Sequence, residues 1–225
     1  MNHRYYSVSD EAVNWTALIY CAAYVPLIFP ASWIMEKRGL RFSICLGAFG
    51  TALGSCIKAF SASSNLFWLL MIGQTIVACS QIFILSVPPR LAAVWFSPQE
   101  VSKACAFGVF GNQLGIALGF QIPTILVPNS DDPVVVSKNL QTLFTTVALV
   151  TVGVLFAVFL FFREKPPLPP NKSRLVEIPS DFGITIRQLA SNRSYLLLLV
   201  SYGINTGTFY TISTLLSQMT GKYYP

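Results

Sequence analysis

The sequence predicts an all-α, polytopic membrane protein with six transmembrane helices. Of its 225 residues, 53% are hydrophobic and only 11% are charged, and the mean hydropathy is +0.58. A soluble domain carries about 25% charged residues, so this composition favours a membrane protein. The second observation is length, because six apolar stretches each reach the roughly 20 residues that a helix needs to cross a bilayer.

The apolar stretches follow one another with short polar connections. Pro26, Pro30 and Pro123 lie inside the first and fourth stretches, where a proline removes a helical hydrogen bond and predicts a kink. The predicted spans are 13–35, 41–62, 66–87, 101–127, 138–162 and 195–217.

Basic residues predict the orientation. Alternating the loops places 11 of the 15 Lys and Arg on one side, which should therefore be the cytoplasm (Lys37, Arg38, Arg41, Arg90, Lys103, Arg163, Lys165, Lys172, Arg174, Arg187 and Arg193). Both termini then lie outside, and we expect the sequence to lack the first helix of a longer protein. The net charge of +6 thus reflects cytoplasmic loops, not nucleic-acid binding.

One linker divides the chain. We predict an N-terminal helical half over 1–162, a cytoplasmic linker over 163–193, and the first helix of a C-terminal half over 194–225. Within the linker, residues 182–190 predict a short amphipathic helix, with apolar members Phe182, Ile184, Ile186 and Leu189. The five cysteines form no CxxC pair, so neither a disulfide framework nor a metal site or cofactor is predicted.

Several stretches identify a family. The loop ASWIMEKRGLR (31–41), with Gly39 at its turn, and the segment FILSVPPRLAAVWFSPQEVSKACAFGVFGNQLG (83–115) are the most specific. With YVPLIFPASW, FREKP and YGINTGTFYTISTLLSQM, they resemble the feline leukaemia virus subgroup C receptor family of major facilitator transporters. The resemblance implies a partial major facilitator fold, the second to seventh of twelve helices, in the plasma membrane. It also implies transport of choline and ethanolamine, with haem export as an alternative.

The fourth predicted span, 101–127, contains two side-chain amides within an apolar segment. Gly108, Gly111, Gly115 and Gly119 share one narrow helical face, which predicts a closely packed neighbouring helix. Asn112 and Gln113 interrupt this apolar segment, and amides facing lipid would be costly, so both must face protein or water. We expect Gln113 to bridge helices, whereas the resemblance implies that Asn112 faces a substrate cavity.

Other candidate site residues come from three further spans. Gln74 and Gln81 lie seven residues apart on one helical face, which suggests a water-lined wall of a cavity. Gln81 also matches a substrate-contacting glutamine of the family. Tyr210 stands where the family places a pocket aromatic residue. Tyr20 and Cys21 line the equivalent face of the first span.

The residues in the spans restrict the chemistry. No Asp, Glu or His lies inside any predicted span, so there is no sign of proton coupling. Aromatic faces hold a quaternary ammonium well, and amides can hold a hydroxyl, which suits facilitative movement of choline. Haem would need an axial ligand, and His3 is poorly placed for that role. A non-transporting product that binds other membrane proteins is the other alternative, and no catalytic constellation predicts an enzyme.

Overall fold

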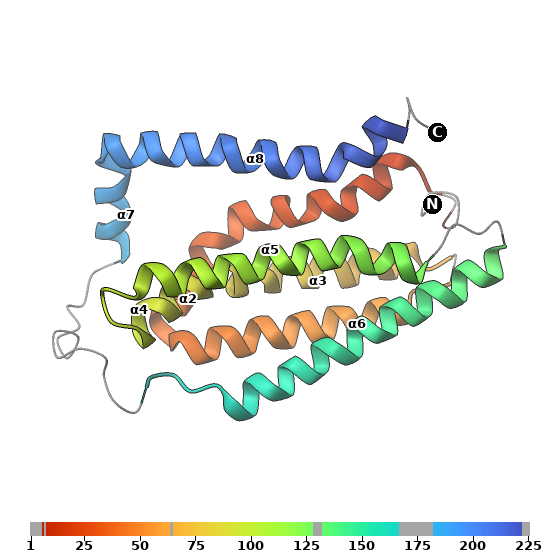
Figure 1. Cartoon of the computed structure of the whole chain (residues 1–225), viewed down its shortest axis with the longest axis horizontal. Helices are drawn as coiled ribbons and strands as arrows, with labels where there is room; N and C mark the ends of the chain where they lie inside the picture. The colour runs from red at the N-terminus through yellow and green to blue at the C-terminus, as the bar shows by residue number, and fades with distance from the viewer. Residues whose placement is uncertain (1–5, 7, 64, 128–131, 167–181, 222–225) are drawn as a thin grey trace. The chain divides into compact units, whose positions relative to one another are not determined.

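The structure is a computed structural model that describes residues 6, 8–63, 65–127, 132–166 and 182–221. Every regular element in these residues is an α-helix, which confirms the predicted all-α class (Figure 1). The chain forms two compact units, Met1–Leu175 and Val176–Pro225, and residues 167–181 of the predicted linker lie outside the described residues. The first unit contains α2 (Asp10–Ala59), α3 (Phe67–Leu85), α4 (Val87–Trp95), α5 (Val101–Leu126) and α6 (Pro133–Phe161), and the second contains α7 (Phe182–Ser191) and α8 (Arg193–Gly221).

Helix α2 contains the first two predicted spans, joined by a sharp turn at Gly39. This glycine has φ 86° and ψ 174°, a conformation that L side chains rarely adopt, so the turn predicted there is confirmed. The helix continues through Pro26 and Pro30, and Gly39 is the residue within it that leaves helical geometry. The two halves of α2 therefore form a hairpin, drawn in red and orange in Figure 1.

The end of α6 holds this turn in place. The backbone N–H groups of Leu40 and Arg41 donate to the two carboxylate oxygens of Glu164, at 2.7 and 2.6 Å. The Arg41 guanidinium donates in turn to the carbonyl oxygen of Phe159, at 3.2 Å. A Cβ on Gly39 would collide with the Glu164 carboxylate, so the turn and its carboxylate partner require a glycine. Glu164 thus supplies the acceptors that the first N–H groups of the second half of α2 would otherwise lack.

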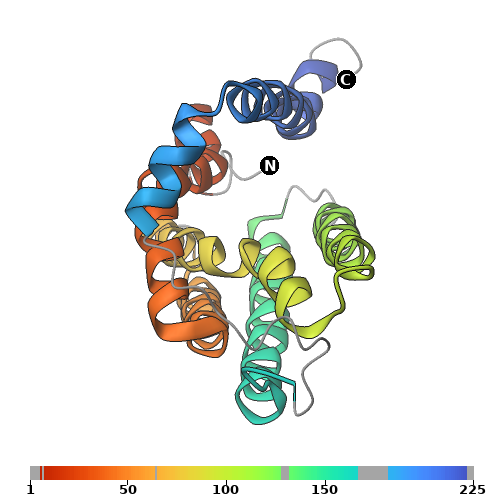
Figure 2. The same ribbon diagram turned by 90° about the vertical axis from the view of Figure 1, so that its left-hand side faces the viewer.

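The second half of α2 packs against α3 through small residues. A Cβ on Gly54 would lie 2.6 Å from the carbonyl oxygen of Gly73, and one on Gly47 would lie 2.8 Å from the Ile84 side chain. These pairings run in opposite directions along the two chains, so the helices are antiparallel. Figure 2 shows the same helices approximately end-on. Buried residues of this contact include Ala48, Ala52, Val77, Ala78 and Ile82.

The observed helices match the predicted spans with three differences, the first being that α4 extends the apolar stretch of the third span from its predicted end at 87 to Trp95. Four helices in the described residues are long and apolar enough to cross a membrane, namely Glu11–Ala59, Phe67–Trp95, Val101–Leu126 and Val134–Phe161, and the first of them covers two predicted spans. The sixth predicted span, 195–217, forms α8 but is not among these four, because polar residues such as Ser201, Asn205 and Thr206 lower its hydropathy.

The fifth predicted span also starts earlier than expected. Helix α6 begins at Pro133, five residues before the predicted boundary of 138. Asp132 caps it, since its carboxylate accepts from the Val134 backbone N–H at 2.9 Å. A proline at the first helical position is favourable because its missing N–H would have no helical partner. The apolar pattern alone does not reveal this cap.

Candidate functional site

The candidate site residues lie near the middle of their apolar helical stretches. Gln81 lies near the end of α3, at the middle of the apolar stretch Phe67–Trp95 that α3 and α4 form together, and Gln113 is one of the two central residues of α5, with Asn112 beside it. Tyr20 and Tyr210 lie within four residues of the midpoints of the first half of α2 and of α8, or about 6 Å along the axis. Helices that cross a bilayer would place all of these side chains near the same depth.

A hydrogen-bonded bridge joins three helical segments, namely the two halves of α2 and helix α3. The Lys58 ammonium donates to Gln74 Oε1 at 3.0 Å, and Gln74 Nε2 donates to the Thr16 carbonyl oxygen at 3.0 Å. Gln74 therefore joins helices, and the water-lined wall suggested for its face of α3 stays a prediction. A buried amide in lipid is stabilised by such interhelical partners. The sequence did not reveal the bridge because its members are far apart in the chain.

The bridge sets the register between α2 and α3. The first half of α2 runs parallel to α3, because both run antiparallel to the second half of α2. Tyr20 lies one turn beyond Thr16, and Gln81 lies two turns beyond Gln74 on the same face. Tyr20 and Gln81 therefore lie within about one helical turn of each other in depth, and both are half-buried. Cys21, the other candidate, points about 100° away from Tyr20 and is exposed.

The amide of Gln81 has no partner in the described part of the chain. No hydrogen bond to its side chain is present there, in contrast to Gln74 two turns away. The Gln81 residue is half-buried, and its amide is not among the fully buried polar atoms of the described residues, so it can be reached from outside the helix. Gln81 is thus available to bind a polar group that enters from outside the helix pair.

Among the described residues, only one glycine of the predicted α5 stripe has a close neighbour, so the packing of the rest of the stripe stays a prediction. A Cβ on Gly108 would lie 2.8 Å from Pro88 of α4, but nothing in the described residues lies within 4 Å of such an atom on Gly111, Gly115 or Gly119. The physical reason is position, because α5 contacts α4 and α6 and leaves the rest of its surface open. The close glycine-mediated approach occurs instead between α2 and α3.

The two α5 amides differ in exposure. Asn112 lies one turn after Gly108 and is half-buried, whereas Gln113 is exposed. Neither side chain has a hydrogen bond within the described ranges 8–63, 65–127, 132–166 and 182–221. Gln113 therefore has no helix to bridge in this part of the chain, and the interhelical role expected for it stays a prediction, as does the cavity role of Asn112.

Tyr210 belongs to the second unit. Its ring is 42% exposed and contacts Phe209 edge-on, with the ring centroids 5.7 Å apart. Because α8 belongs to a different compact unit from α2–α6, the grouping of Tyr210 with Gln81 and Asn112 stays a prediction. The aromatic ring is accessible within its own unit.

Sequence reasoning missed Glu164 as an organising residue. The available signals were a lone acidic residue between Arg163 and Lys165 and a glycine at the turn of the first loop, but their 124-residue separation gave no reason to pair them.

The described residues contain no group of three His, Cys, Asp or Glu side chains that could hold a metal ion. The chemistry available at mid-helix is that of amides and aromatic rings.

These features define a multi-pass helical membrane protein with polar side chains at mid-span, as carriers have. The Major Facilitator Superfamily matches residues 3–224, and the chain therefore belongs to that superfamily. The all-helical architecture with four candidate membrane spans is consistent with a partial fold of that superfamily, and the predicted superfamily is confirmed.

Individual transporters of the superfamily resemble this chain over nearly its whole length. The chain is 47% identical to the uncharacterised MFS-type transporter C09D4.1 of Caenorhabditis elegans, over 98% of this chain and 38% of that protein. It is 41% identical to the choline/ethanolamine transporter flvcr2a of Danio rerio, over 99% of this chain and 48% of the relative. It is 42% identical to the choline/ethanolamine transporter FLVCR1 of Felis catus, over 98% and 40% respectively. The predicted family resemblance is confirmed, and the chain spans less than half the length of these relatives.

Proposed function

We propose that this chain forms part of a facilitative carrier for choline and ethanolamine in the plasma membrane. Three features support the proposal: the relatives named as choline/ethanolamine transporters, the aromatic and amide side chains at mid-span, and the lack of Asp, Glu and His inside the predicted spans. The observation that carries it is the half-buried side chain of Gln81, whose amide has no partner in the described residues, at the middle of the apolar stretch Phe67–Trp95.

The chemistry of the site suits these two substrates. A quaternary ammonium offers no conventional hydrogen bond, so an aromatic face such as that of Tyr210 is its natural partner. The amides of Gln81 and Asn112 then bind the hydroxyl of choline. Ethanolamine has a primary ammonium that can also donate to amide oxygens. Tyr20, one turn from Gln81 in depth, supplies a second aromatic wall, and Cys21 and Gln113 are peripheral to this arrangement.

Movement of the substrate follows from the architecture of the superfamily. In alternating access, two helical halves rock about a site near the bilayer midplane. We assign residues 1–162 to one half and 194–225 to the start of the other, with 163–193 as the connection. The predicted spans of these 225 residues contain no carboxylate or histidine to carry a proton, which favours movement of the substrate down its own gradient.

The two alternatives have less support. Haem export would call for an axial ligand, and His3, the single histidine, lies outside the described residues. A non-transporting role through binding of other membrane proteins has no specific observation in its favour. We therefore propose neither, and the transport experiment below tests the carrier directly.

The decisive experiment compares two cations in cells expressing the protein that contains these residues. Gln81→Ala should weaken saturable choline uptake by about two- to tenfold, the range for one lost hydrogen bond. Uptake of tetramethylammonium, which has no hydroxyl, should change much less. Gln74→Ala is the matched control, because its amide is already occupied by Lys58 and Thr16. That variant should lower the amount of folded protein and affect both cations equally.

Two results would count against the proposal. Equal losses of both cations in Gln81→Ala would show that Gln81 acts structurally. The absence of any saturable choline or ethanolamine uptake by the unmodified protein would contradict the carrier itself.

A further inference from the structure

The short helix α7 and the start of α8 form a fixed corner. The Asn192 side chain sits between the two helices, and its Oδ1 accepts from the backbone N–H groups of Ser194 and Tyr195 at 3.1 and 3.2 Å. The Asn192 backbone N–H donates to the carbonyl of Leu189 at 3.1 Å. As a result α7 runs across the axis of α8, not along it (Figure 1). If α8 crosses the bilayer, α7 lies along its surface.

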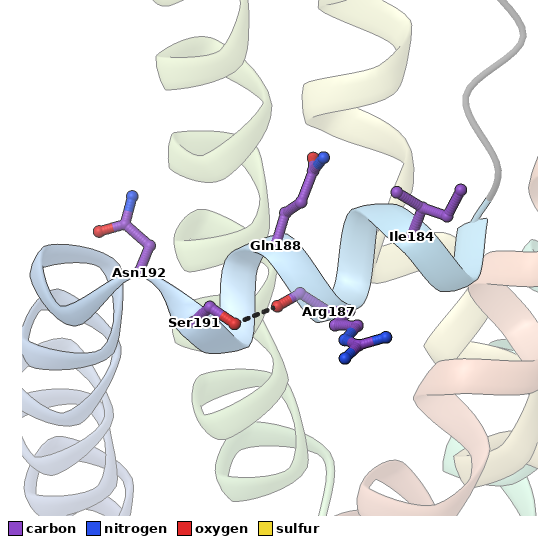
Figure 3. A pocket seen from close by; sticks show the side chains of 5 residues that line it. All are labelled: Ile184, Arg187, Gln188, Ser191 and Asn192. Atoms are coloured by element: carbon purple, nitrogen blue, oxygen red, sulfur yellow. Dashed lines mark hydrogen bonds between the residues drawn. The ribbon is translucent and has the colours of Figure 1, made fainter.

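The two faces of α7 differ in character. Ile184, Arg187, Gln188 and Ser191 are spaced by three, four and seven residues, so they share one face, and with Asn192 they line a shallow open hollow (Figure 3). Ile184 thus lies with the polar residues, not with Ile186 and Leu189 as predicted. The side chain of Phe182, the remaining predicted apolar member, lies outside the described part.

Figure 3 also gives the direction of these faces relative to α8. Ile184 and Gln188 point away from the side toward which α8 extends. Ile186 lies on the opposite side of the α7 helix, about 160° from each of these residues around the axis, and Leu189 lies beside it, about 140° from Ile184 and 100° from Gln188. Ile186 therefore points toward the side to which α8 extends, and Leu189 lies at the edge of the same apolar face.

Charge complements this apolar face. Arg187 lies at the flank of α7, and Arg193 follows at the start of α8, while residues 182–193 contain no acidic side chain. A short helix with an apolar face, a polar face and basic flanking residues is the pattern of helices that lie in a membrane interface. The cytoplasmic leaflet is rich in anionic lipid, which attracts such basic residues.

We propose that α7 is a membrane-surface anchor that binds the anionic phospholipids of the cytoplasmic leaflet. Ile186 and Leu189 enter the acyl boundary, and Arg187 and Arg193 contact the phosphates. The anchor rests on the orientation predicted from the loop charges and is independent of the substrate. It would hold the start of α8 at the membrane surface.

The test uses the protein in lipid nanodiscs, with a spin label at residue 186 or 188 in a background in which the native cysteines are replaced by alanine. The label replacing Ile186 should be more accessible to oxygen, which concentrates in lipid, and the label replacing Gln188 more accessible to a water-soluble nickel chelate. Adding phosphatidylserine to phosphatidylcholine should increase the immersed population of the label at 186. Arg187→Gln should reduce that population ratio roughly fivefold, the value for one basic side chain near an anionic surface.

Lys103→Gln is the matched control, because Lys103 is an exposed basic residue on the same predicted side but outside α7. It should leave the immersed population unchanged. Amide hydrogen exchange of residues 182–191 in the unmodified protein provides a second measurement, and it should slow when phosphatidylserine is present. Equal water exposure of both labels, or exchange that is independent of phosphatidylserine, would overturn the proposal.

Discussion

At the scale of single residues, polar groups within this apolar chain fall into two kinds. Gln74, Lys58 and Glu164 have partners on other segments and hold helices together. Gln81 and Asn112 have none in the described residues and lie at mid-span. Since an amide is costly in lipid without a partner, the first kind is structural, and the second kind carries the substrate-binding role that we propose.

Tyr210 gives a residue-scale prediction for the cation. Tyr210→Ala should weaken choline by roughly 1–2 kcal/mol if the site is desolvated, because the aromatic face that holds the quaternary ammonium is lost. Tyr210→Phe should retain most of the affinity, since the ring and not the hydroxyl makes the interaction. Competition by unlabelled choline in an uptake assay measures both variants. Equal damage by Phe and Ala would exclude the cation–π assignment.

Gly39 gives a second residue-scale prediction. Gly39→Ala should destabilise the protein by about 1–3 kcal/mol, because alanine disfavours the observed φ of 86°. Its Cβ would also displace the Glu164 carboxylate from the Leu40 and Arg41 N–H groups. Thermal unfolding of the detergent-solubilised protein measures the effect.

Gly153→Ala is the control for that substitution, since nothing in the described residues lies within 4 Å of the added Cβ in α6. It should be neutral or slightly stabilising, because alanine favours a helix more than glycine does. Similar melting of the two variants would show that the turn at Gly39 does not depend on glycine.

At the scale of helices, small residues decide which elements approach closely. The glycines of α5 are spaced correctly for a close contact, yet three of the four face open space in the described structure. The glycines of the second half of α2 lie against α3. Spacing on one helix thus indicates the capacity for a contact, and the fold decides where that capacity is used.

Gly54→Ala tests the contact between α2 and α3. Its Cβ would lie 2.6 Å from the Gly73 carbonyl oxygen, and a backbone carbonyl in a packed helix moves with difficulty, so we expect destabilisation of about 1–3 kcal/mol. Gly115→Ala in α5, with open space around the new Cβ, should have little effect on melting. A loss at Gly115 that equals the loss at Gly54 would contradict the observed helix contacts.

At the scale of the whole molecule, loop charge predicts the orientation in the membrane. Eleven of the 15 basic residues fall on one predicted side. The hydrogen bond from Arg41 to the Phe159 carbonyl oxygen and the corner between α7 and α8 lie on the same predicted side. Because cytoplasmic loops retain Lys and Arg during insertion, this side should face the cytoplasm.

Two exposed loop residues test this orientation in the protein whose native cysteines are replaced by alanine. A cysteine replacing Gln99, between α4 and α5, should react with a membrane-impermeant maleimide only after the cells are permeabilised. A cysteine replacing Asn65, between α2 and α3, should react on intact cells. The opposite pattern would invert the predicted topology and, with it, the membrane face assigned to α7.

The sequence by itself determined the fold class, the positions of the helices and the superfamily. Apolar length and the scarcity of charge act locally along the chain, so they predict a helix wherever a segment must satisfy its backbone in lipid. Even the short helix α7 was visible from its pattern, although Ile184 was placed on the wrong face. The central polar residues Gln81 and Asn112 were recognisable because they interrupt apolar runs.

Only the tertiary structure decided which polar residues are structural and which are free. Gln74 and Gln81 have the same residue type on the same helical face, but Gln74 meets Lys58 and Thr16, whereas Gln81 meets no hydrogen-bond partner in the described residues. Glu164 became a cap for a helix that begins 124 residues earlier. Such pairings depend on the register between distant segments. That register is fixed by packing of all the helices together, so no local pattern contains it.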